Sequence, residues 1–169
     1  CNGTVPESDT VGGGGAGGFR SGTAVLGPGL YRCNVGSGAP AVQGEDKPNG
    51  SPSSIESNKG FNVTSAGGGR GGSAKYPTSS IYNDRRPKVE PTSGGSGGGG
   101  GSGPSIYSPQ ITGSPGNDPA VTPPQGNAGG DGTSPAKGSG GGGGAGGAGG
   151  DANGGAGGAG GVGRAYPFS

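Results

Sequence analysis

The chain has 169 residues, of which 51 are glycine and 16 are proline. In average proteins, glycine and proline make up only about 7% and 5% of the residues. Only 24% of the residues are hydrophobic, Met, Trp and His are absent, and the net charge is +1. A conventional core is excluded, because ordering a residue costs about 1–2 kcal/mol while burying a large apolar side chain returns about 1.5–3. We expect no nucleic-acid partner from this charge and, without a long apolar run, no membrane span.

The first part of the chain combines a glycine run with short strand patterns. A polar stretch over residues 1–10 leads into glycine-rich residues 11–19. In residues 30–35 the alternation places Tyr31, Cys33 and Val35 on one face of a predicted strand. Because Gly27-Pro28-Gly29 is a turn signal, we expect residues 23–26 to be the hairpin partner of this strand.

Two further short strands are predicted at residues 53–56 and 61–65. In the second of them, Phe61 and Val63 lie on one face, whereas Asn62 and Thr64 lie on the other. Glycine runs follow at residues 67–72 and 94–103.

The remaining chain favours extended backbone. Residues 104–137 are rich in proline, which fixes φ near −65° and is excluded from helix interiors, and residues 138–163 are almost wholly Gly and Ala. No segment predicts an α-helix. We divide the chain into a glycine-rich segment with a short hairpin (1–72), Pro/Ser/Asn-rich loops with a glycine run (73–137) and a Gly-Gly-X segment (138–169), which together form one continuous structural unit.

A three-residue period in the last segment predicts how the backbone is held. Ala or another side chain recurs every third residue, in two sets separated by a slip: Ala145, Ala148, Asp151 and Ala156, Ala159, Val162. Polyproline II geometry has three residues per turn and no internal hydrogen bonds, so its amides and carbonyls are free to pair with neighbouring rods.

These features predict an irregular glycine-rich fold: a bundle, or sandwich, of polyglycine II or polyproline II helices with a few short β-strands. Gly-Gly-X runs are expected in an outer layer with X outward, and unbroken runs such as 97–101 and 140–144 in inner positions. Collagen is disfavoured, because it requires glycine strictly at every third position.

The chemistry of an enzyme is missing from the sequence. Without His, no Ser-His-Asp or Cys-His arrangement exists within the chain. The stretch 149–154 resembles a single Gly/Asp calcium repeat, but one copy offers too few carboxylates for six to eight oxygen ligands. We therefore expect no catalytic residue, no metal and no cofactor.

Cysteines and asparagines suggest modification sites. Cys1 and Cys33 permit one disulfide in an extracellular chain; the alternatives are Cys33 as a small apolar residue on its strand face and Cys1 as a lipidation site. Three N-glycosylation sequons start at Asn62, Asn2 and Asn49. Asn62 is the best candidate, because it lies on the outward strand face.

The order of segments resembles the glycine-rich domain of tailed-phage tail fibres and virion adhesins. The resemblance is carried by GGGGAGGF at 12–19, PGLY at 28–31 leading to VGSG at 35–38, NGSPS at 49–53, TSAGGG at 64–69 and NDPAVTPPQGNAGG at 117–130. Cys33 and the charged section 73–91 depart from the family pattern.

This resemblance implies a structural virion surface protein that presents loops for host attachment. Receptor contacts would fall on the loops around Tyr76, Tyr82 and Tyr107, with a bacterial surface glycan as the ligand. Partners would be other virion or fibre subunits, including further copies in a homo-oligomer, at the virion surface or outside the cell.

Two other functions stay open from the sequence. One is a self-assembling extracellular fibre or matrix glycoprotein, in which the rods pair between subunits. The other is an ice-binding protein, which needs a flat regular face that the short rows from Ala145 to Val162 supply poorly.

Overall fold

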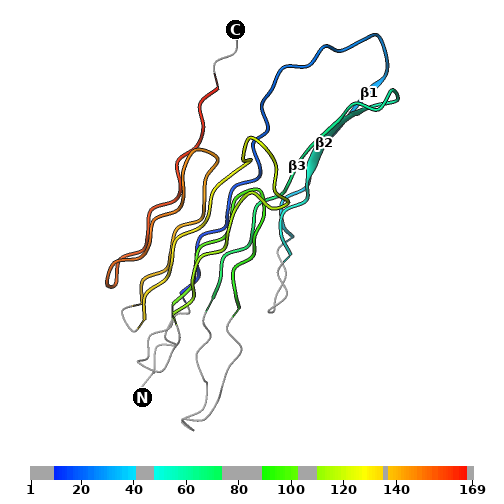
Figure 1. The fold of residues 1–169 in the computed structure, drawn as a ribbon. Coiled ribbons are helices and arrows are strands. Elements are labelled where there is room, and N and C mark those ends of the chain that lie inside the picture. Colours follow the sequence, from blue (N-terminus) through cyan, green and yellow to red (C-terminus); the bar gives the residue numbers. More distant parts are fainter. Residues whose placement is uncertain (1–9, 41–47, 74–88, 103–109, 135–136, 167–169) are drawn as a thin grey trace.

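The computed structural model describes residues 10–40, 48–73, 89–102, 110–134 and 137–166. Within these ranges there is no α-helix, as predicted, and the regular structure is one small antiparallel sheet of three strands. The rest of the described chain is irregular, mostly extended backbone. Figure 1 shows many extended segments lying side by side along a common direction, with the sheet projecting from one end.

The sheet has the order β1-β2-β3 and is formed by Tyr31–Asn34, Ser53–Ser57 and Asn62–Ser65. All three strands are near the predicted positions. Cys33 lies opposite Ile55, which in turn lies opposite Val63, so the apolar residues share one face. Exposed Asn62 lies on the other face, as the alternation predicted.

The predicted pairing of residues 23–26 with the first strand is wrong. β1 pairs with β2 instead, and Val25 is fully exposed at 101%. Pairing with β2 places Cys33 against Ile55 and fixes the ring of Tyr31 near that of Phe61, with centroids 6.3 Å apart. A tight hairpin with residues 23–26 would give neither contact.

Nine extended runs make up most of the described chain outside the sheet. In chain order, and named hereafter by this order, they cover residues 10–19, 66–73, 89–93, 94–102, 110–117, 125–133, 138–146, 147–153 and 156–164. Successive runs alternate in direction, because each chain reversal returns the next run alongside those already placed (Figure 1).

Backbone hydrogen bonds join the runs with a spacing of three residues. The amides of Gly12, Gly15 and Gly18 in the first run donate to the second run at 2.7–2.8 Å. Gly13 and Ala16, each one residue further along, donate to the seventh run at 3.0 Å. Each run therefore turns the same side toward a given neighbour at every third residue.

The buried centre of the molecule is backbone rather than side chain. Residues 94–102 and 140–144 are buried throughout, which confirms the inner positions predicted for the unbroken glycine runs. The buried hydrophobic side chains among the described residues are Val89, Ile111 and Ala152. The side chains of the Gly-Gly-X runs lie outward as predicted, with Ala148, Asp151, Ala156, Ala159 and Val162 exposed and Ala145 half-buried.

Candidate functional site

The fourth run lies at the centre of the bundle and is hydrogen-bonded on every side. It donates amides to the first, second, third and sixth runs and accepts from the second, fifth and seventh. Six different runs thus surround it. Because its amides and carbonyls find partners on neighbouring backbones, a buried segment with hardly any side chains can remain ordered.

Glycine is required in the fourth run because neighbouring backbones leave no space for a Cβ atom. A Cβ on Gly97 would overlap the carbonyl oxygen of Ser114, one on Gly98 that of Arg70, and one on Gly100 that of Ile111. Since backbone atoms cannot swing away as a flexible side chain does, the contacts exclude every other residue type without displacing a neighbouring run.

Gln125 is a polar anchor that the sequence analysis did not single out. Its side chain is 1% exposed; the Oε1 atom accepts from the Ala66 amide at 2.9 Å and the Nε2 atom donates to the Pro119 carbonyl at 2.8 Å. It therefore ties the sixth run to the second run and to the proline-rich loop. Within a spacer of Pro, Asn and Gly, no sequence pattern marks this glutamine as buried.

Asn117 organises the same loop. With φ at 57°, it adopts the left-handed conformation that asparagine tolerates. Its Oδ1 atom accepts from the amides of Val121 and Gln125, and its own amide donates to Gly95 of the central run. The loop 117–125 is consequently fixed to the bundle by polar contacts.

Several run ends meet at one edge of the bundle. Isolated antiparallel bridges join Thr10 to Ser102, Val11 to Ser73 and Ser73 to Val89. Residues 74–88, which include Tyr76 and Tyr82, connect the two members of the last bridge. Tyr107 follows Ser102 in the sequence. The three tyrosines themselves lie outside the described residues, so their roles remain predictions.

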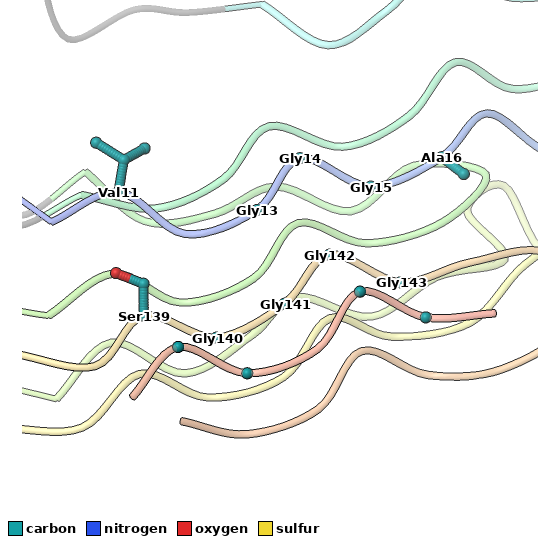
Figure 2. Close-up of a pocket in the computed structure, with 14 residues that line it drawn as sticks. Val11, Gly13, Gly14, Gly15, Ala16, Ser139, Gly140, Gly141, Gly142 and Gly143 are labelled. Carbon is teal, nitrogen blue, oxygen red and sulfur yellow. The ribbon is translucent and has the colours of Figure 1, made fainter. Parts of the chain in front are cut away.

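An open groove runs between the first and ninth runs, above the seventh run. Its lining residues, shown in Figure 2, are almost all glycine: Val11, Gly13, Gly14, Gly15, Ala16, Ser139, Gly140, Gly141, Gly142, Gly143, Gly157, Gly158, Gly160 and Gly161. With so few side chains, the groove offers backbone amides and carbonyls rather than catalytic groups.

The predicted modification sites differ in accessibility. Asn62 is exposed, and its Oδ1 atom accepts from the Thr64 hydroxyl of the same sequon at 3.1 Å. The Asn49 side chain is occupied: its amide donates to the Ser93 carbonyl at 2.7 Å, and its oxygen accepts from the Arg70 amide. Asn2 lies outside the described residues.

Cys33 is exposed and forms no disulfide within the described residues. Cys1 lies outside the described residues, so the Cys1–Cys33 disulfide stays a prediction. Among the described residues, no group of three or more His, Cys, Asp or Glu side chains is placed to hold a metal ion. A search of the same residues finds no helix that could cross a membrane.

Comparison with protein-family models, with curated proteins and with solved structures finds no match to this chain.

Proposed function

We propose that the nine runs are polyglycine II helices stacked as a three-layer sandwich, and that this sandwich is a virion surface scaffold presenting loops for host attachment. One outer layer contains the second and first runs. The middle layer contains the third, fourth, seventh and ninth runs, and the other outer layer contains the fifth, sixth and eighth runs. The observation that carries the proposal is the three-residue spacing of backbone hydrogen bonds between runs.

The spacing supports polyglycine II geometry because a β-strand would repeat its hydrogen bonds every two residues and face two neighbours. Here the amides of Gly140 and Gly143 donate to the fourth run, and those of Gly141 and Gly144 donate to the eighth. Two rows at different angles on one run require a threefold screw, which three residues per turn supply.

The arrangement of the loops supports a display role. Ser73, Val89 and Ser102 flank the tyrosine-bearing segments and belong to one bridged cluster at the edge of the bundle. A backbone-bonded scaffold leaves the sequence of such segments free to vary, because none of the glycine contacts between runs depends on them. By the resemblance to virion adhesins, their ligand is a bacterial surface glycan.

Glycan binding tests this function. The purified chain should bind a subset of bacterial surface polysaccharides on an array, and Tyr76→Ala, Tyr82→Ala and Tyr107→Ala should each weaken binding by about tenfold, or about 1.4 kcal/mol. Val25→Ala is the control, because that side chain is fully exposed and lies outside the tyrosine-bearing segments. Absence of binding to every bacterial glycan, or equal losses in the control, would contradict the adhesin role.

A further inference from the structure

The seventh run has five hydrogen-bonded neighbours where the fourth run has six. It donates to the fourth, eighth and ninth runs and accepts from the first, sixth and ninth. Every third amide of this run points in the same direction, so its amides form three rows. Two of the rows donate hydrogen bonds to neighbouring runs: Gly140 with Gly143, and Gly141 with Gly144. In the third row, the amides of Ser139 and Gly142 have no hydrogen-bond partner among the described residues.

This unused row belongs to residues that line the open groove. The groove is bounded by the first and ninth runs, which flank the seventh run on either side of its open face (Figure 2). Gly142 is buried, although its amide is unpaired. Buried amides without a partner are rare in native proteins, so the floor of the groove is incomplete as it stands.

The walls of the groove have the complementary polarity. Carbonyls of Gly14 on the first run and of Gly158 and Gly161 on the ninth run accept no hydrogen bond from the described residues. A chain lying in the groove would meet donors beneath it and acceptors on both sides. The fourth run meets the same combination of donors and acceptors in the centre of the bundle.

We propose that this groove binds one extended glycine-rich segment of a different polypeptide, as a tenth rod that completes the shorter outer layer. The occupant must lack Cβ atoms where it faces the floor and walls, so a Gly-Gly-X repeat with X outward fits. About four to five residues are in contact, or roughly 12–15 Å at a rise of about 3.1 Å per residue.

The present sequence does not supply this rod. The segments outside the described residues, 1–9, 41–47, 74–88, 103–109, 135–136 and 167–169, contain at most one glycine each. The chain's glycine runs are already placed in the bundle, and those of a second copy would be held in its own bundle in the same way. The inference stands on the hydrogen-bond pattern and is independent of whether the loops bind a glycan.

The test is titration of the isotope-labelled chain with a lysine-flanked peptide of Gly-Gly-Ala repeats, about 12 residues long, followed by NMR. We expect saturable binding, with the largest amide shifts at Ser139 and Gly142. A matched Gly-Val-Ala peptide should not bind. The same shifts with the valine peptide, no saturable binding, or shifts centred elsewhere would overturn the proposal.

Two variants of the chain sharpen the test. Gly157→Val and Gly160→Val place side chains into the groove. An added Cβ at Gly157 meets only the Ser139 carbonyl oxygen, at 3.5 Å, and one at Gly160 meets nothing within 4 Å. Each should weaken peptide binding by about tenfold, while Gly22→Val, also unobstructed but outside the groove, should not. Equal affinity in all three variants would overturn the proposal, and so would self-association of the chain that Gly160→Val removes, because the occupant would then be a second copy.

Discussion

At Gly97, Gly98 and Gly100, a methyl group in place of hydrogen would overlap carbonyl oxygens of the fifth and second runs. Positive φ, the usual reason for requiring glycine, is found among the described glycines at Gly60 and Gly154. Glycine in the centre of the bundle is therefore selected by close approach of backbones, and its substitution is a packing defect.

We predict that Gly98→Ala destabilises the protein by at least about 1–3 kcal/mol, the usual cost of overpacking. Gly160→Ala is the matched control: nothing lies within 4 Å of the added Cβ. That change should be neutral or stabilise by up to about 1 kcal/mol, because alanine restricts the unfolded chain. Urea unfolding of both variants measures the difference, and equal stability would contradict steric exclusion at Gly98.

Gln125→Leu should destabilise the protein by about 1–3 kcal/mol, because it removes the acceptor of the half-buried Ala66 amide and leaves the Pro119 carbonyl without its donor. Gln110→Leu is a control at an exposed position of the fifth run. Thermal unfolding of the two variants provides the comparison. A loss at Gln110 as large as that at Gln125 would show that the buried contacts are not responsible.

At the scale of the element, the sequence predicted the short strands and the inner and outer glycine runs. Strand positions followed from alternation, as in Tyr31 and Cys33, and inner runs followed from the absence of side chains over 97–101. The partner of β1 was not predictable in this way, because the turn signal at Gly27-Pro28-Gly29 is local while the pairing of Cys33 with Ile55 spans distant residues. Gln125 was missed for the same reason, since its partners Ala66 and Pro119 are brought together only by the fold.

Amide hydrogen exchange should show a three-residue period within single runs. In the seventh run, Gly140, Gly141, Gly143 and Gly144 donate to neighbours and should exchange slowly, whereas Ser139 and Gly142 should exchange faster. In the ninth run, Gly158 and Gly161 should be protected while Gly157 and Gly160 exchange rapidly. Exchange followed by NMR gives these rates, and alternate protection with a period of two would argue for β-strands instead.

At the scale of the whole molecule, stability comes from paired backbone groups with few apolar side chains. The buried hydrophobic side chains among the described residues are only Val89, Ile111 and Ala152. The composition made this absence of a conventional core predictable. The number of neighbours around each run was not, because every glycine run offers the same donors and acceptors.

Calorimetry should reveal this balance. Unfolding that exposes polar backbone lowers the heat capacity change, while apolar exposure raises it. We expect the heat capacity change on unfolding to be roughly half of the usual 12–15 cal/mol/K per residue, or less. A value in the usual range would mean that apolar burial dominates after all.

Alternation of run direction also bears on how such a molecule can change in size. The same backbone hydrogen bonds, at the same three-residue spacing, join parallel neighbours and antiparallel neighbours. The first and seventh runs are a parallel pair, and the first and second runs are an antiparallel pair. A newly inserted out-and-back pair of glycine runs would therefore find compatible partners on any open side, whichever way it points. Growth by duplication of such pairs would widen the scaffold without requiring compensating substitutions elsewhere in the chain.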